Sequence, residues 1–373
     1  MSGEKRSSHP FYMWDSISTT SKYLKETLEL EQEIKSIAKN LAEEGVERIL
    51  FTACGTSNHL GLAGEYFFQE FAKIETKSVH AFELLNYYPL KFDKKIAVVA
   101  ISHSGGSKAT IDATRYVMKK GAKSVAITHI PRSLLAEIAD RTLILPGSES
   151  QAGPKTRSYT CGLLALSLLS ISLGELHGTK GFLEYNELRK ELNDIPRVAE
   201  SILINCKTAT EELSSKYKDM KDVYIVGGGL NYVTALEAAM KMKETMYIHA
   251  ESQEIEETAH LFFVGYNKGT VTFVVAPKGR SYQRALDIVN AANVPGFTTI
   301  SIVEEDDSEI SKISTETIKI PGNIREIFTP MLYIIPLQML TYQIAIDNGY
   351  FPDTLKREDP NYLKAHQIFQ AHI

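Results

Sequence analysis

Cysteine is scarce in this chain of 373 residues. Only three cysteines occur, Cys54, Cys161 and Cys206, and they stand far apart in the sequence. They form neither a CxxC pair nor the dense set that staples small secreted domains. The first ten residues are polar and contain no apolar signal core. Together these absences predict a cytoplasmic protein without structural disulfides.

Uninterrupted apolar runs of membrane-spanning length are also missing. The two most apolar stretches, residues 161–173 and 330–346, are broken by serine in one case and by Pro336 and Gln338 in the other. A bilayer crossing requires about 20 consecutive apolar residues. Both stretches are therefore expected to be buried helices, and no membrane partner is predicted.

Long basic tracts and metal-ligand spacings are absent as well. The net charge is −5, and no run of lysine and arginine is long enough to mark a nucleic-acid surface. The ten histidines show no HExxH spacing, and the cysteines are dispersed. We therefore expect no nucleic-acid partner, no metal and no other cofactor.

Short apolar runs alternate with helical patterns along most of the chain. Such alternation predicts an α/β protein with doubly wound parallel sheets in a three-layer, flavodoxin-like arrangement. A chain of this length is also too long for one typical core. The expected strands are residues 48–53, 77–82, 96–101, 124–128, 142–145, 223–226, 271–276, 298–303 and 317–320.

The second half of the chain repeats the first. Residues 223–229, an apolar run ending in three glycines, echo residues 49–55, and a long helical pattern follows each of them. This self-similarity predicts an internal duplication of one α/β unit. The expected organisation is a helical lead (1–45), a first α/β domain (46–178), a helical connector (179–217), a second α/β domain (218–349) and an extended tail (350–373).

Two loops rich in glycine and hydroxyl side chains follow buried strands of the first domain. Each comes directly before a helical pattern, so its backbone N–H groups and the helix dipole favour an anion. Hydroxyls and backbone amides fit a phosphate monoester on a small ligand better than a nucleotide triphosphate with magnesium. Ordinary strand-to-helix turns are the alternative. The candidate phosphate-binding residues are Thr56, Ser57, Ser102, His103, Ser104 and Ser107.

These loops resemble those of the sugar isomerase (SIS) domain family. A second motif, residues 235–244 followed by 247–251, resembles the isomerase half of glucosamine-6-phosphate synthase and related phosphosugar isomerases, deaminases and deglycases. The chain departs from the family at His103, Gly106 and Ser107, where Gln, Glu and Thr are usual. Lys155-Thr156-Arg157 replaces the usual Ser-Thr-Lys. No glutaminase domain precedes the SIS units, so a glutamine-dependent synthase is not expected for this chain alone.

A charged stripe lies along the helical pattern of the second motif. Glu237, Lys241 and Glu244 are spaced by four and three residues, which places them on one helix face. A solvated surface ion pair would show the same spacing and would contribute only about 0.3–0.5 kcal/mol. The resemblance instead implies that Glu244 shuttles a proton between sugar carbons, with Lys241 beside it.

The resemblance implies functional roles for two further residues. His260 matches the family's ring-opening histidine, which the partner subunit contributes, although Leu261 stands where Gly-Pro is usual. Lys364 matches the tail lysine that reaches the sugar carbonyl, provided that the alignment shifts by one residue. A homodimer with composite active sites is therefore expected. His103 could either donate to the phosphate or merely pack.

The resemblance implies a phosphosugar enzyme. The favoured reaction converts glucosamine 6-phosphate into fructose 6-phosphate and ammonia. Fructosamine 6-phosphate deglycation and plain aldose–ketose isomerisation use the same proton transfer and stay open. A sensor that binds a sugar phosphate without chemistry is the alternative from another class. Retention of Glu244 and His260 favours the enzyme.

Overall fold

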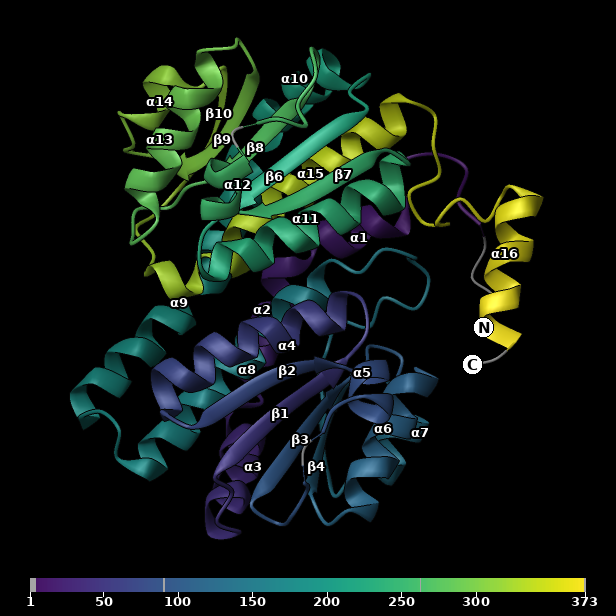
Figure 1. Ribbon diagram of the computed structural model, residues 1–373, viewed down its shortest axis with the longest axis vertical. Helices are drawn as coiled ribbons and strands as arrows, with labels where there is room; N and C mark the ends of the chain where they lie inside the picture. Colours follow the sequence, from purple (N-terminus) through teal and green to yellow (C-terminus); the bar gives the residue numbers. More distant parts are fainter. Residues whose placement is uncertain (1–4, 90, 262, 372–373) are drawn as a thin grey trace. The chain divides into compact units, whose positions relative to one another are not determined.

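We analysed a computed structural model of the chain, which describes residues 5–89, 91–261 and 263–371. Contacts divide the chain into two compact units (Figure 1). The first-sheet unit comprises residues 22–150, 157–194 and 364–373. The second-sheet unit comprises residues 1–21, 151–156 and 195–363, so it is assembled from three separate segments of the sequence.

The first-sheet unit contains strand–helix repeats in chain order. Its elements are α2 (Thr20–Leu28), which starts in the other unit, α3 (Glu31–Glu43), β1 (Arg48–Ala53), α4 (Thr56–Phe67), the π-helical turn η1 (Phe68–Ala72), β2 (Glu75–His80), α5 (Ala81–Asn86), β3 (Ile96–Ile101), α6 (Lys108–Lys119), β4 (Lys123–Thr128), α7 (Leu134–Ile138), β5 (Arg141–Ile144) and α8 (Arg157–His177).

The sheet of this unit is parallel, with strand order β2-β1-β3-β4-β5. Helices α3, α4 and α8 pack together in one layer, and α5, α6 and α7 form the other (Figure 1). The central strand β3 is buried along its whole length because both of its faces are covered. The predicted three-layer, flavodoxin-like α/β unit is confirmed.

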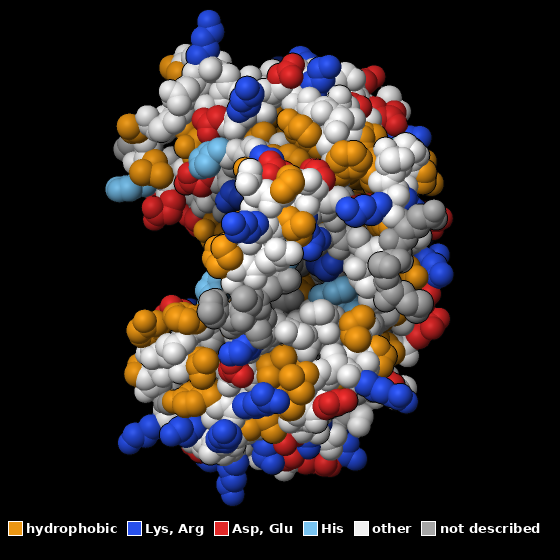
Figure 2. All heavy atoms as spheres, turned by 90° about the vertical axis from the view of Figure 1, so that its right-hand side faces the viewer, with side chains coloured by type: hydrophobic (Ala, Val, Ile, Leu, Met, Phe, Trp, Pro, Cys, Tyr) orange, Lys and Arg blue, Asp and Glu red, His pale blue; other side chains and the backbone are white. Residues whose placement is uncertain are grey.

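Blue Lys and Arg side chains and red Asp and Glu side chains are interspersed over the face that Figure 2 shows. The acidic side chains that give the protein its net charge of −5 are therefore not concentrated in one patch on the described part of that face.

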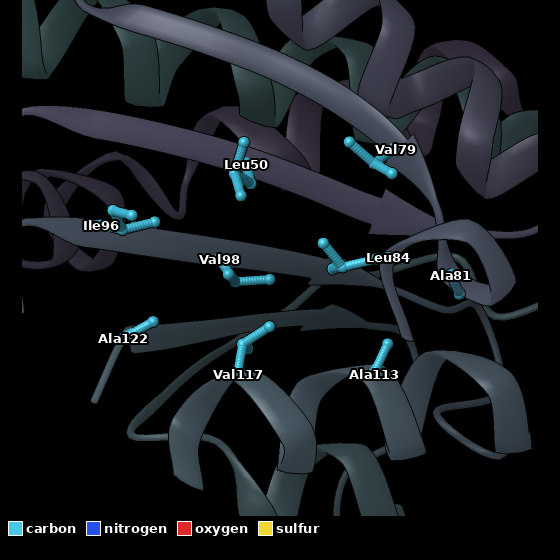
Figure 3. Packing of buried hydrophobic residues seen from close by; sticks show 9 residues of the cluster. All are labelled: Leu50, Val79, Ala81, Leu84, Ile96, Val98, Ala113, Val117 and Ala122. Atoms are coloured by element: carbon cyan, nitrogen blue, oxygen red, sulfur yellow. The ribbon is translucent and has the colours of Figure 1, made fainter. Parts of the chain in front are cut away.

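Aliphatic side chains hold the first sheet to its helices. Leu50 and Val98, on the paired strands β1 and β3, point toward Val117 and Ala113 of α6 (Figure 3). All four side chains are buried. Full burial of each of the three larger side chains contributes about 1.5–3 kcal/mol, so this cluster holds β1 and β3 against α6.

The second-sheet unit repeats this plan. Its elements are α1 (Tyr12–Ser18), α10 (Lys207–Tyr217), β6 (Asp222–Gly227), α11 (Leu230–Met246), β7 (His249–Glu254), α12 (Ile255–Leu261), β8 (Val271–Val275), α13 (Tyr282–Asn293), β9 (Thr298–Glu304), α14 (Ile310–Ile313), β10 (Glu316–Ile320), the 3-10 turn η2 (Glu326–Phe328) and α15 (Pro330–Asp347). The strand order β7-β6-β8-β9-β10 has the same topology as the first sheet, with parallel pairing throughout. This match supports the predicted duplication.

Two further helices belong partly to each unit. They are α9 (Phe182–Asn205) and α16 (Pro360–Ala371). The expectation of an extended segment throughout the tail is wrong from Pro360 onward. Residues 361–369 of α16 are almost all exposed, so a local helical preference rather than core burial accounts for this element.

One strand was missed by the sequence analysis. The expected strands included none between residues 227 and 270, but residues 249–254 form β7, with His249 as its first residue. The strand reads His-Ala-Glu-Ser-Gln-Glu, and only Ala250 and Gln253 within it are buried. Because β7 is an edge strand, it needs no continuous apolar run, and its polar residues concealed the β pattern.

Helix α8 is the one described helix that is long and apolar enough to cross a membrane. Its apolar window is 89% buried inside the protein. Such burial is what a core helix shows, in agreement with the expectation from its interrupted apolar run. Helix α15 occupies the matching place in the second-sheet unit, where it packs along α11 and α10.

Candidate functional site

Helix α11 carries a buried line of three charged side chains. Its sequence is rich in Ala, Leu, Met, Lys and Glu, which are strong helix formers, and it starts directly after Gly229, at φ 54°. The Lys241 ammonium lies between two carboxylates. Its Nζ is 3.2 Å from Glu237 Oε1 and 2.5 Å from Glu244 Oε2. The predicted helix face is therefore present, and it is not a solvated surface.

Exposure separates the roles of these three residues. The side chains of Glu237 and Lys241 are 0% and 1% exposed, whereas that of Glu244 is 25% exposed. A group that exchanges protons with a ligand must be reachable, and the supporting charges need not be. Glu244 is thus the member of the line that can meet a substrate, and Lys241 orients its carboxylate from behind.

The electrostatics follow from this burial. Burial raises the pKa of the Glu244 carboxyl, and the nearby Lys241 opposes that shift without cancelling it. Burial lowers the pKa of Lys241, but the charges of Glu237 and Glu244 outweigh it, so the net shift is upward. Lys241 therefore stays charged, while Glu244 is a carboxyl poised closer to neutral pH than usual, as proton transfer requires.

The two candidate phosphate loops leave neighbouring strands of the first sheet. Because β1 pairs with β3 in parallel, the loops after them lie at the same sheet edge. Gly55 and Gly105 adopt φ of 59° and 61°, a left-handed conformation that favours glycine. A Cβ on Gly105 would also collide with the Ser133 side chain. The structure therefore brings the two predicted loops together in one unit.

The hydroxyls of these loops differ in exposure. Ser102 is buried, Ser104 is exposed, and Thr56, Ser57 and Ser107 are half-buried. Ser104 Oγ accepts a hydrogen bond from the Gly106 N–H at 3.1 Å, and Ser107 Oγ accepts one from the Thr110 hydroxyl at 3.1 Å. These local bonds hold the loops in shape.

His103 lies inside the second loop. Its Nε2 accepts a hydrogen bond from the Glu149 backbone N–H at 3.0 Å. Its ring stacks on His129, with 4.9 Å between ring centroids. Acceptance from an N–H requires Nε2 to be unprotonated, so this nitrogen anchors the loop to residue 149 rather than donating to a ligand.

His260 and Lys364 lie on exposed surfaces. His260 is near the end of α12, and among the described residues no hydrogen bond or ion pair joins it to Glu244. Lys364 lies in the first turns of α16, with its side chain in solvent. The structure of one chain thus does not bring His260 into the charged line of α11.

A second lysine acts on Glu244 and was not predicted. Lys155 lies in the segment 151–156 that belongs to the second-sheet unit, and its charge, like the larger effect of Lys241, lowers the pKa of Glu244 and so opposes the effect of burial. The signal in the sequence was the departure from Ser-Thr-Lys at this place. Within the ranges that the structure describes, no three His, Cys, Asp or Glu side chains gather to hold a metal ion.

The fold and these sites define a family. The SIS domain matches the chain twice, over residues 41–172 and 216–347, and the chain belongs to this family. Within this family, the chain is similar over 94% of its length to a glutamine–fructose-6-phosphate aminotransferase.

The curated relatives are longer enzymes. Glutamine–fructose-6-phosphate aminotransferase (isomerizing) of Thermococcus kodakarensis is 31% identical over 350 residues, which are 94% of this chain and 57% of that protein. The protein of the same name from Pyrococcus horikoshii is 33% identical over 308 residues, 82% of this chain and 50% of that one. The chain thus spans about half the length of the relatives it matches.

Solved structures show the same fold. The C-terminal domain of glucosamine-fructose-6-phosphate aminotransferase from Francisella tularensis superposes with a TM-score of 0.85 at 24% identity, covering 94% of this chain and 99% of that one. Glucosamine-6-phosphate deaminase from Thermotoga maritima gives 0.70 at 21%, covering 92% and 97%. Tagatose-6-phosphate ketose/aldose isomerase from Escherichia coli gives 0.78 at 16%, covering 95% and 98%.

Proposed function

We propose that this protein is an amino-sugar phosphate deaminase that converts glucosamine 6-phosphate into fructose 6-phosphate and ammonia. One observation carries the proposal: a reachable carboxyl, Glu244, is supported from behind by the buried pair Glu237 and Lys241. A pKa of Glu244 raised by burial supports a group that both takes and returns a proton.

The proposed reaction is a proton transfer followed by hydrolysis. The Glu244 carboxylate takes the proton from C2 of the open-chain amino sugar and returns it to C1, which leaves an imine at C2. Water adds to that carbon and ammonia leaves, so one water is consumed for each ammonia released. Separately, we propose that the hydroxyls of the two loops of the first-sheet unit bind a phosphate monoester, through Thr56, Ser57, Ser102, Ser104 and Ser107.

Deglycation of a fructosamine 6-phosphate and plain aldose–ketose isomerisation use the same proton transfer. The matched relatives do not decide among them, because the chain spans about half of those proteins. A panel of sugar 6-phosphates assayed for ammonia, amine and ketose release tests the choice. Failure to release ammonia from glucosamine 6-phosphate would reject the deaminase.

Replacement of Glu244 separates an enzyme from a sensor. Glu244→Gln should leave sugar-phosphate affinity nearly unchanged and lower turnover by about 10²-fold or more, because it removes the proton-transfer group. Wild-type protein that binds a sugar phosphate but turns over none would instead be a sensor. We expect turnover to persist in the presence of a chelator, in line with a metal-independent reaction.

We also propose a homodimer in which His260 of each chain completes the partner's site. The exposed position of His260 in the single chain supports this arrangement. Leu261 and Val264, which are 48% and 84% exposed beside it, would gain from an interface. Co-refolded Glu244→Gln and His260→Ala chains should regain about a quarter of wild-type activity, because half the molecules are heterodimers with one intact site of two. No recovery despite proven subunit exchange contradicts the shared site.

A further inference from the structure

The second candidate phosphate loop, residues 102–107 between β3 and α6, is tied to a distant part of the chain. It contacts the connecting segment, residues 146–149, which follows β5 in the same unit. The contact is the hydrogen bond that His103 Nε2 accepts from the Glu149 backbone N–H at 3.0 Å. Glu149 is 3% exposed, so its N–H is shielded from water and His103 supplies an acceptor in its place.

The connecting segment is itself held by the first turn of helix α8. Arg157 donates from Nε to the Gly147 carbonyl oxygen at 3.0 Å and from Nη2 to the Ser148 carbonyl oxygen at 2.8 Å. The Glu149 carboxylate accepts hydrogen bonds from the Ser158 N–H at 3.0 Å and from the Ser158 hydroxyl. The loop is therefore attached to a segment that a buried core helix already fixes.

The ring of His103 is held on a second side by another histidine. It stacks on the His129 ring, with 4.9 Å between the centroids and 29° between the planes. His129 is buried, and its Nδ1 donates to the Pro146 carbonyl oxygen at 2.8 Å, which ties this ring to the connecting segment too. The His103 backbone carbonyl accepts from the His129 N–H at 3.0 Å and from the Thr128 hydroxyl at 3.1 Å. These contacts fix both the backbone and the ring of His103.

The hydrogen bond to Glu149 depends on the protonation state of His103. Nε2 accepts the Glu149 N–H only while this nitrogen carries no proton, and a protonated Nε2 would direct its own N–H at that donor. Histidine is the side chain that ordinarily titrates in the neutral range. Acidification through that range therefore removes the bond between the loop and the connecting segment.

The charged and titratable groups around this contact have partners of their own. Glu149 and Arg157 are bonded to the first turn of α8 and to the connecting segment, as described above. Lys108, at the start of α6, is paired with Asp112 at 2.9 Å. An additional proton on the His129 ring would leave its bond to the Pro146 carbonyl in place. A proton on Nε2 of the stacked ring instead breaks the bond that holds the loop.

We propose that His103 is a positioning residue for the second phosphate loop: its neutral ring holds residues 102–107 in place for a phosphate, and protonation of Nε2 releases them. The inference rests on the proposed phosphate binding for its purpose, whereas the anchor itself is a contact of the structure. A loop that is in place only part of the time binds more weakly, because apparent affinity falls with the fraction of competent protein. Glutamine, the residue usual at this position in the family, does not titrate, so the response to pH is particular to this chain.

Hydrogen–deuterium exchange tests the anchor without any ligand. At pH 8, the amides of residues 102–107 and 149 should exchange about 3–10-fold faster in full-length His103→Leu than in the wild type, because the Glu149 N–H loses an acceptor. His103→Gln should retain the wild-type protection, since its side-chain carbonyl oxygen can accept the same N–H. Unchanged exchange in β8 of the other unit shows that each variant is folded. Equal protection of the loop in the wild type and His103→Leu contradicts the anchor.

Phosphate binding provides the second readout. Inorganic phosphate, which carries the recognised group and cannot be turned over, is titrated by calorimetry at pH 8 and pH 5.5. The wild type and His103→Gln should bind alike at pH 8, and the wild type should lose about 3–10-fold more affinity at pH 5.5. His103→Leu should bind more weakly than His103→Gln by a similar factor at both pH values. The ionisation of phosphate changes equally for every variant, so the differences between variants report on the protein.

A matched control is the exposed His249 at the start of β7 in the other unit. His249→Gln removes one titrating imidazole and should keep the wild-type response to pH. The same response in the wild type and His103→Gln, or an equal change in His249→Gln, overturns the proposal. Absence of phosphate binding in the wild type at pH 8 rejects the proposed phosphate site and with it the purpose of the anchor. The exchange experiment still decides in that case whether the anchor exists.

Discussion

Removal of the Lys241 charge should destabilise the second-sheet unit strongly. The ammonium is 1% exposed and bonded to Glu237 at 3.2 Å and to Glu244 at 2.5 Å. Lys241→Met keeps the apolar stem but leaves two carboxylates without their counter-charge, one of them fully buried. Breaking a buried ion pair in this way costs about 3–5 kcal/mol. With a urea slope of about 2–3 kcal/mol per molar, the midpoint should fall by roughly 1–2.5 M.

The protein contains a reporter for this unit. Its single tryptophan, Trp14, lies in α1 of the second-sheet unit, with its ring 5.3 Å from that of Tyr342. Urea unfolding followed by Trp14 fluorescence therefore reads the unit that holds Lys241. Lys243→Met, at an exposed position on the same helix, is the control and should change the free energy of unfolding by less than about 0.5 kcal/mol.

The loss of unfolding free energy in Lys241→Met should become larger as the pH rises. In Lys241→Met, burial without a counter-charge raises the folded-state pKa of Glu244 beyond its already raised value. A carboxyl whose folded pKa is raised contributes stability that is present below its unfolded pKa of about 4.3 and lost as pH rises through the folded value. The difference in unfolding free energy between Lys241→Met and the wild type should therefore grow between pH 5 and pH 8. A midpoint within about 0.5 M of wild type at pH 8 refutes the reasoning.

Three other outcomes follow from separate contacts. Gly64→Ala should cost about 1–3 kcal/mol of stability by circular dichroism, because its Cβ would lie 2.5 Å from the fully buried ring of Phe51. A thiol reagent should label exposed Cys54 quickly, whereas the two buried cysteines, whose pKa values burial raises to about 12, should react only after unfolding. Asp353→Ala should cost about 1–2 kcal/mol in the Trp14 transition, since α1 loses the carboxylate that accepts from two of its N–H groups, and the asparagine variant should cost less.

Local sequence patterns predicted most of this fold for a physical reason. Strands buried on both faces, such as β3, are continuous apolar runs, and glycine with hydroxyl residues after them marks the turn into a helix. The charged stripe on α11 could also be predicted, since a spacing of four and three residues defines one face of a helix. The burial of this stripe could not be predicted, because its positions hold charged residues rather than the apolar residues that mark an inward-facing side.

Such local patterns could not predict contacts between segments that are distant in the sequence. Gly153, for example, docks on residues 353–355, and no periodicity links those places. The edge strand β7 was concealed for a different reason, because solvent on its open side permits polar residues. Helix α16 is nearly all exposed and leaves no amphipathic signature that distinguishes it from an extended tail.

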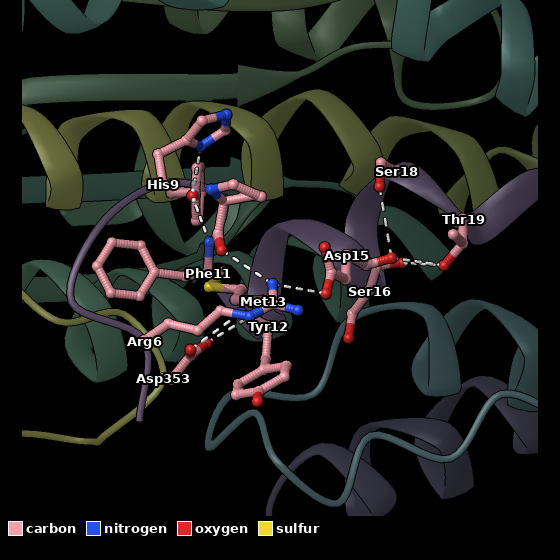
Figure 4. Close-up of polar contacts among 12 residues, drawn as sticks. Arg6, His9, Phe11, Tyr12, Met13, Asp15, Ser16, Ser18, Thr19 and Asp353 are labelled. Carbon is pink, nitrogen blue, oxygen red and sulfur yellow. Dashed lines mark hydrogen bonds and ion pairs between the residues drawn. The ribbon is translucent and has the colours of Figure 1, made fainter. Parts of the chain in front are cut away.

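The hydrogen bonds between Asp353 and the start of α1 have a consequence for how the chain is made (Figure 4). Tyr12 and Asp353 are separated by 341 positions, so the N–H groups at the start of α1 cannot gain this partner until residue 353 has been synthesised. Helix α1 has seven residues, and a helix that short is not stable in water without tertiary contacts. The second-sheet unit therefore cannot complete this contact while residues 13–352 are being made.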